Sequence, residues 1–175
     1  MWVLGLDTAT PHLTLGLWDG QRGVERVMKV EKGHEKMLFP ALEGLLAEAG
    51  VRKEEIGLIA VGLGPGSYTG LRMAIAAGEG LGLGLSARVV GVSSLLAAAW
   101  PHLKPEPLTV AFRLRNGLFY TATYQKEGKE VRVLKPERKV QLLPPGPLLL
   151  DPPPSGLALA QLGLERGGPV EPVYL

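Results

Sequence analysis

The first hundred residues alternate between short apolar runs and amphipathic stretches, a pattern typical of an α/β layer. Apolar runs at 2–6 and 12–18 predict two strands, and the Asp19-Gly20 turn leads into a third strand near 24–30. Apolar residues then recur at helical spacing and predict a helix over 35–49, as shown by Met37, Leu38, Ala41, Leu42, Leu45, Leu46 and Ala49.

The same region continues with a second alternation of strand and helix. We expect a strand over 58–62, a helix over about 70–84, a strand over 88–92, and a short helix capped by Ser93 or Ser94. The resulting order, βββαβαβα, predicts an α/β fold built on a mixed sheet. We assign this first lobe to residues 1–104.

Proline marks the end of the first lobe. Three prolines within 101–107 form a stiff connector that neither a helix nor a central strand accommodates. Beyond it, the pattern predicts three strands, a short apolar run and one short helix, at 108–113, 118–125, 130–135, 148–150 and 156–165. The second lobe, residues 105–175, is therefore predicted to be reduced and mostly β.

Composition restricts the class of protein. The chain has 175 residues, of which 46% are hydrophobic and 21% charged, and it contains no cysteine. This composition predicts a folded domain and excludes disulfides, thiolate catalysis and cysteine-bound zinc. No uncharged apolar run reaches membrane-spanning length, and the apolar start is too short for a signal peptide. We expect a cytoplasmic protein with no membrane partner.

The net charge of +2 is too small to indicate a nucleic-acid binder by itself. Eight basic residues nevertheless gather between Arg113 and Lys139, against three glutamates. This stretch is either the solvated face of a hairpin, which we favour, or an edge that faces RNA.

Residues 64–72, Gly-Pro-Gly-Ser-Tyr-Thr-Gly-Leu-Arg, connect a buried strand to a helix N-terminus. Such a loop offers backbone N–H groups at the positive end of a helix dipole, an arrangement that suits phosphate. It lacks the lysine that a phosphate loop places after its last glycine. The sequence therefore predicts a vestigial nucleotide or anion site, whose candidates are Asp7, Thr8, Gly64, Gly66, Ser67 and Thr69.

Each candidate also has a purely structural interpretation. Asp7 could orient a magnesium-bound water, or it could stabilise the turn after the first strand, which we favour. Ser67 and Thr69 could bind an anion, or they could cap the following helix. Arg72 carries a positive charge on the first turn of that helix, where it is unfavourable with the dipole unless an acidic partner is present.

Several motifs carry a resemblance to a known family. Residues 4–10, Leu-Gly-Leu-Asp-Thr-Ala-Thr, followed by 13–17, resemble the opening of the actin-like ATPase superfamily, which has a ribonuclease H-like fold of two lobes. Residues 64–72 and 89–95 are similar to the TsaB (YeaZ) family, a degenerate paralogue of the TsaD (Gcp/Kae1) carbamoyltransferase. The resemblance covers about the first hundred residues and returns in the closing Pro-Val-Tyr-Leu of 172–175.

The resemblance implies a role in making threonylcarbamoyladenosine at position 37 of tRNAs that read ANN codons. It implies a non-catalytic scaffold or activator that binds a TsaD-like carbamoyltransferase, with a TsaE-like ATPase as a further partner. It also implies a homodimer when the chain is alone and only indirect contact with tRNA. We expect no cofactor.

Departures from the family pattern argue against catalysis. Arg113-Leu114-Arg115 stands where the family usually has Asp-Ala-Arg, so a carboxylate that would help to hold Mg²⁺ is missing. The glycine pair that would seat adenosine occurs only as Gly167-Gly168, near the chain end. We therefore expect no complete nucleotide site between the lobes and no second-lobe carboxylate that faces it.

Metal and peptidase sites have little support. The three histidines, His12, His34 and His102, do not form a pair at helical ligand spacing, so no metal site is predicted. No cysteine nucleophile or zinc motif is present, and the sequence Gly66-Ser67-Tyr68-Thr69-Gly70 does not form a nucleophile elbow.

The helix over 70–84 contains several glycines, each of which costs about 0.5–1 kcal/mol relative to alanine. Either this helix packs closely on its own sheet, or it meets a partner together with the helix over 35–49. The resemblance favours a partner interface, formed by Arg72, Ala74, Ala77, Gly78, Leu81, Met37, Leu38 and Leu45.

Three classes of function compete. We favour the non-catalytic scaffold over a nucleotide-binding phosphotransferase of the actin-like superfamily, because the phosphotransferase needs a second-lobe carboxylate and an adenosine pocket. A glycoprotease-like peptidase is the least supported, since the chain has neither nucleophile nor metal motif.

Overall fold

Five strands form the first sheet of the computed structural model, which describes residues 1–30 and 32–175. Their spatial order is β3-β2-β1-β4-β5. The strands β1 (Trp2–Asp7), β2 (His12–Trp18) and β3 (Gly23–Lys29) form an antiparallel meander. The strands β4 (Ile56–Gly62) and β5 (Arg88–Val92) lie parallel to β1, which makes the sheet mixed.

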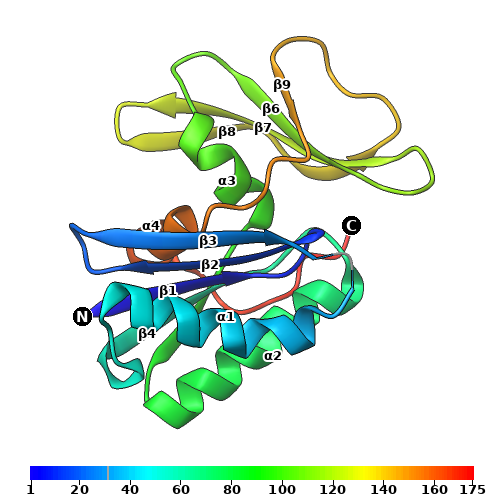
Figure 1. The fold of residues 1–175 in the computed structure, drawn as a ribbon. Coiled ribbons are helices and arrows are strands. Elements are labelled where there is room, and N and C mark those ends of the chain that lie inside the picture. The colour runs from blue at the N-terminus through cyan, green and yellow to red at the C-terminus, as the bar shows by residue number, and fades with distance from the viewer. Residues whose placement is uncertain (31) are drawn as a thin grey trace.

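Two long helices cover one face of this sheet, α1 (His34–Ala49) and α2 (Tyr68–Leu85) (Figure 1). Gly50, in the left-handed region at a φ of 68°, ends α1. The helix α2 begins after the loop that follows β4, and Ser67 caps it through a hydrogen bond from the backbone N–H of Gly70.

The second lobe is a four-stranded sheet in the order β8-β7-β6-β9. Its strands are β6 (Leu108–Arg113), β7 (Phe119–Glu127), β8 (Glu130–Val140) and β9 (Leu148–Leu150). The short helix α3 (Ser94–Ala99) packs against this sheet, and two single-turn helices, η1 (Lys53–Glu55) and η2 (Trp100–His102), complete the connections.

The strand β8 continues five residues past the predicted end at 135, through Pro136. Proline is tolerated there because β8 is an edge strand and its pairing with β7 is irregular between Thr121 and Tyr124.

The last helix, α4 (Gly156–Arg166), returns to the first lobe and covers the face of the sheet opposite α1 and α2 (Figure 1). Its approach is close: a Cβ atom on Gly16 would lie 2.2 Å from the carbonyl oxygen of Gly156. Glu25 holds the start of α4, since its Oε1 accepts the backbone N–H of Gly156 at 2.9 Å. The prediction grouped this helix with the second lobe, whereas it packs on the first sheet.

No helix within the described part of the chain is long and apolar enough to cross a membrane.

Candidate functional site

Asp7 ends β1 and is buried in the centre of the first lobe, with 1% of its surface exposed. Its Oδ1 accepts the backbone N–H of Ala9 at 2.8 Å, and its Oδ2 accepts the hydroxyl of Ser94 at 2.5 Å. Gly62 on β4 lies against the same carboxylate, so that a Cβ atom there would fall 1.7 Å from Oδ2. The carboxylate is thus enclosed by its own chain.

Burial raises the pKa of Asp7 to about 6, although the hydrogen bonds from Ser94 and Ala9 partly oppose this shift. A carboxylate held in this way stabilises the turn after β1. The bond from Ala9 lies within this turn, and the bond from Ser94 joins the turn to the start of α3.

The glycine loop is held to the end of β1 by its own polar groups. The backbone N–H of Ser67 donates to the carbonyl of Ala9 at 2.8 Å, and the hydroxyl of Thr8 donates to the carbonyl of Gly70. The N–H of Gly64 donates to the Ser94 hydroxyl at 3.0 Å.

Glycine is required on this loop because it lies against the backbone of the neighbouring strand end. A Cβ atom on Gly66 would lie 2.2 Å from the carbonyl oxygen of Ala9. Of the six predicted anion-site residues, Gly66, Ser67 and Thr69 line the cavity between the lobes, whereas Asp7, Thr8 and Gly64 do not. Thr8 and Asp7 instead take part in the buried hydrogen bonds beneath it.

A cavity of about 850 Å³ separates the two lobes. The first lobe contributes His12, Lys29, Lys32 and His34 to its lining, and the second contributes residues at the ends of β6 and β9. His12 has its pKa lowered by partial burial and by the nearby charge of Lys29. The Nε2 atom of His34 is buried and has no hydrogen-bond partner among the described residues.

The second lobe does place a carboxylate in this cavity, contrary to the prediction. Asp151 follows β9 and lines the cavity together with Arg113. The two form an ion pair, with Nε of Arg113 2.5 Å from Oδ2 of Asp151, and the N–H of Arg113 donates to Oδ1 at 2.8 Å. The sequence did not indicate this contact because 38 residues separate the partners.

These residues do not fit the magnesium-bound nucleotide of a complete actin-like ATPase. The Asp7 carboxylate is engaged on both oxygens below the cavity, and Asp151 is neutralised by Arg113. Within residues 1–30 and 32–175, no three acidic or histidine side chains gather where they could hold a metal ion.

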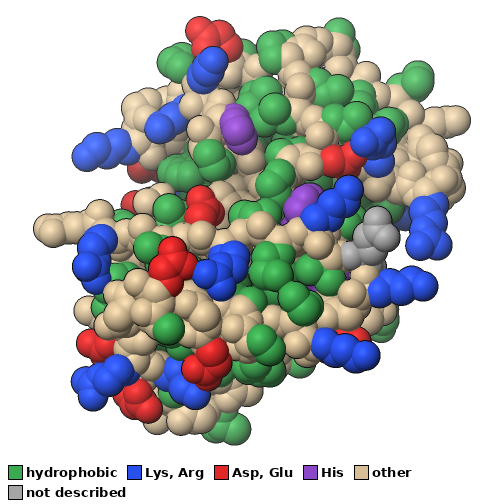
Figure 2. Space-filling model, viewed as in Figure 1, with side chains coloured by type: hydrophobic (Ala, Val, Ile, Leu, Met, Phe, Trp, Pro, Cys, Tyr) green, Lys and Arg blue, Asp and Glu red, His purple; other side chains and the backbone are tan. Residues whose placement is uncertain are grey.

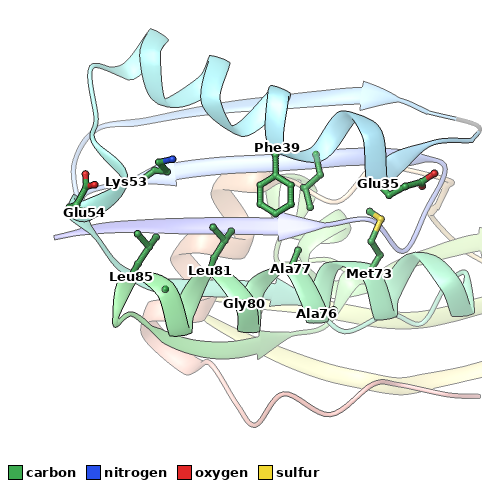
Figure 3. Close-up of a pocket in the computed structure, with 12 residues that line it drawn as sticks. Glu35, Phe39, Lys53, Glu54, Met73, Ala76, Ala77, Gly80, Leu81 and Leu85 are labelled. Atoms are coloured by element: carbon green, nitrogen blue, oxygen red, sulfur yellow. The ribbon is translucent and has the colours of Figure 1, made fainter.

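A second hollow, of about 700 Å³, runs between α1 and α2 on the outside of the first lobe. Figure 3 shows Phe39 pointing from α1 toward Ala77 and Leu81 on α2, with Met73 at one end and Leu85 at the other. Its lining is mainly apolar, and Lys53 and Glu54 mark the end near η1. We call this hollow the helix groove.

The predicted interface is corrected at three positions. Leu45 and Ala74 are fully buried in the core, and Gly78 packs so closely that a Cβ atom would lie 2.3 Å from Cγ1 of Val61. These residues pack on the sheet, because their side of each helix faces it.

The other predicted interface residues lie in or near the helix groove or at the start of α2. Ala77 and Leu81 line the groove, Leu38 lies at its floor and is buried in the core, and Met37 is exposed on α1. Arg72 is exposed and donates to the hydroxyl of Tyr68 at 2.9 Å and to that of Tyr174 at 3.4 Å.

The prediction missed several residues of both sites. Ser94 was considered only as a helix cap, although its hydroxyl joins Asp7 to the glycine loop. Phe39 and Gly80 line the helix groove. An available signal was the glycine pattern of α2: Gly78 and Gly82 face the sheet, whereas Gly80 and Gly84 are offset by two residues and face outward.

Comparisons with known proteins agree with this architecture. The family model described as TsaD, tRNA N6-adenosine threonylcarbamoyltransferase, matches residues 28–164. The tRNA threonylcarbamoyladenosine biosynthesis protein TsaB of Escherichia coli is 32% identical over 147 residues, which cover 78% of this chain and 64% of that protein. The TsaB protein of Bacillus subtilis is 30% identical over 145 residues, covering 81% and 63%. The matched regions thus span less than two thirds of these relatives.

A solved structure of YeaZ from Pseudomonas aeruginosa superposes with a TM-score of 0.87 at 26% identity and covers 99% of both chains. The actin-like α/β fold predicted from the sequence is confirmed. Because the family model covers most of the chain, and both the curated relatives and the solved neighbour are TsaB or YeaZ proteins, this chain belongs to the TsaB (YeaZ) branch of the TsaD family.

Proposed function

We propose that this protein is a non-catalytic partner of a TsaD-like carbamoyltransferase. It would support threonylcarbamoyl transfer to adenosine 37 of tRNAs that read ANN codons. The observation that carries the proposal is the Asp7 carboxylate, whose two oxygens are bound by Ala9 and Ser94 within the fold. A carboxylate used in this way is poorly placed to bind a metal ion or to activate water.

The helix groove is the proposed docking surface for the transferase. Burial of apolar side chains on both sides of such a groove is the main favourable term in association. Phe39, with 49% of its surface exposed, is the large apolar side chain that a partner would cover. In the absence of the transferase, the same groove would pair with a second copy of this chain.

We place the protein in the cytoplasm, with a TsaE-like ATPase as a further partner of the assembled pair. The names of the curated relatives, which describe tRNA threonylcarbamoyladenosine biosynthesis, support this setting.

The test of docking is Gly80→Arg, which puts a long charged side chain into the helix groove at a position where a Cβ atom meets no described atom within 4 Å. Ala47→Arg is the matched control, because Ala47 is exposed on α1 and does not line the groove. We expect Gly80→Arg to weaken binding of the TsaD-like protein at least about tenfold, or about 1.4 kcal/mol, and the control to leave it unchanged. Binding is measured by calorimetry and self-association by sedimentation.

Two results would contradict the proposal. If the Gly80→Arg variant bound the transferase as well as the unaltered protein does, the helix groove would not be the docking surface. Micromolar binding of ATP·Mg²⁺ to the isolated protein, with turnover, would show a phosphotransferase.

A further inference from the structure

Basic side chains from both lobes line the cavity between them. Lys29 and Lys32 come from the end of β3 and the segment that follows it, and Arg113 and Arg115 come from the end of β6 and the turn after it. All four are exposed. Figure 2 shows basic side chains around this hollow on the right of the view, with a histidine beside them. We call these four residues the basic rim.

Within the part of the chain that the structure describes, few acidic side chains lie near the basic rim. The acidic residues that line the described cavity are Glu35 and Asp151, and Asp151 already pairs with Arg113. Among the described residues, Lys29, Lys32 and Arg115 make no ion pair. Positive charges held together in this way keep a positive potential that attracts anions.

The shape of the basic rim suits a chain of phosphates better than a single small anion. Its cations are long, exposed side chains that project from separate elements of two lobes, whereas a small-anion site needs donors that converge on one point. The backbone N–H groups of the nearby glycine loop are already used within the fold. That of Ser67 donates to the carbonyl of Ala9, and that of Gly70 donates to the hydroxyl of Ser67.

An aromatic ring extends the same surface. Tyr120 on β7 lines the cavity, and the ammonium group of Lys139 on β8 lies 6.0 Å from the centre of its ring. Aromatic rings beside basic side chains are the combination that nucleic acid binding uses, because bases stack while phosphates are neutralised.

We propose that the basic rim binds the phosphate backbone of the tRNA directly and bridges the two lobes as it does so. This inference rests on the proposed role in tRNA modification and adds to it a direct contact with the RNA. It also distinguishes the two ends of the basic stretch 113–139 from its middle. Arg113, Arg115 and Lys139 would face RNA, whereas Lys129, in the turn between β7 and β8, would not.

The test compares two double variants with the same change of net charge. Lys29→Glu with Arg115→Glu reverses one rim charge in each lobe, and Arg52→Glu with Lys129→Glu reverses one exposed charge in each lobe away from the cavity. Binding of a fluorescent, unmodified tRNA transcript is measured by anisotropy, with the full-length protein alone and with its TsaD-like partner, over a series of salt concentrations.

We expect the rim variant to bind tRNA at least about tenfold more weakly and the control variant to bind within about threefold of the unaltered protein. The salt dependence should also become shallower, since each lost phosphate contact removes about 0.7–0.9 from the slope of log K against log salt. Both variants should bind the TsaD-like partner normally, because neither pair lies in the helix groove.

The proposal is overturned if the two variants lose the same affinity, which would indicate a bulk charge effect, or if the unaltered protein neither binds tRNA alone nor strengthens tRNA binding by its partner. It is also overturned if ATP displaces tRNA in the unaltered protein but not in the rim variant, because the rim would then hold a free nucleotide. Failure of the unaltered protein to bind its TsaD-like partner would instead contradict the proposed function.

Discussion

The glycine loop and the helix groove both involve α2, and they use glycine for opposite reasons. At the start of the helix, a Cβ atom on Gly70 would lie 2.1 Å from the carbonyl oxygen of Thr8, so glycine permits a contact inside the chain. Along the groove, a Cβ atom on Gly80 or Gly84 would meet nothing within 4 Å in the described structure. Glycine weakens a helix without any contact inside the chain at these two positions, and the proposed docking of a partner would give them a use.

The glycine loop and the helix groove also differ in whether their side chains find partners inside the chain. The loop consumes its polar groups internally through Asp7, Ser94 and Ser67. The groove leaves Phe39 and the small residues of α2 uncovered. A fold whose relatives are named for tRNA modification thus has its inward polar site closed and its outward apolar site open.

The largest effect that we predict concerns the buried carboxylate of Asp7. Because burial raises the pKa of Asp7 from 3.8 to about 6, the folded state binds a proton more tightly than the unfolded state does. The contribution of Asp7 to the free energy of unfolding is fully present below about pH 4 and is lost as the pH rises through about 6. The loss amounts to roughly 3 kcal/mol. Asp7→Asn removes this dependence, so its stability relative to the unaltered protein should rise by about that amount between pH 4 and 7 in urea unfolding.

Asp19→Asn serves as the control of opposite sign. Hydrogen bonds from the backbone N–H groups of Arg22 and Gln21 lower the pKa of Asp19, so its contribution is present at high pH and lost on acidification. If the free energies of unfolding of both variants, relative to the unaltered protein, changed with pH in the same direction, burial of Asp7 would not be the cause of the pH dependence.

A smaller loss is predicted for Gly70→Ala. The added methyl group collides with the carbonyl of Thr8, which is backbone and must shift, so we expect the free energy of unfolding to fall by about 1–3 kcal/mol. Thermal and urea unfolding measure the change. A neutral result would show that the loop can move away from β1 without cost.

The smallest predicted effect is a gain. Gly80→Ala should stabilise the protein by about 0.5–1 kcal/mol, because the methyl group meets no described atom and alanine favours the helix. The same substitution narrows the helix groove, so binding of the TsaD-like partner should weaken in the variant. A gain in both stability and partner binding would argue that docking does not require glycine at position 80.

Much of the fold follows from local pattern. The strand over 12–18 and the strand over 88–92 coincide with β2 and β5, because apolar runs bounded by turns are local signals. The placement of α4 does not follow from such signals, since helical spacing shows that one face is buried but not which sheet buries it. Gly5 and Gly16, inside strands, indicated a close backbone approach without identifying α4 as the neighbour.

The candidate sites were predictable to different degrees. Ser67 was identified as a helix cap because its spacing to Gly70 is local. The pairing of Asp151 with Arg113 and of Ser94 with Asp7 depends on contacts between distant segments, which neither spacing nor composition reveals. The predicted interface residues include both core and groove positions of α1 and α2, because helical period alone did not separate the side of each helix that faces the sheet from the side that faces outward.

The position of α4 has a consequence for the order of folding. The sheet face formed by Val3, Leu58 and Ala60 packs largely against α4, whose residues are synthesised after the whole second sheet. While the chain emerges from the ribosome, this apolar face stays open until α4 arrives and Glu25 can bind its first N–H groups. The core of the first lobe therefore cannot be completed before the residues of the second sheet have been synthesised.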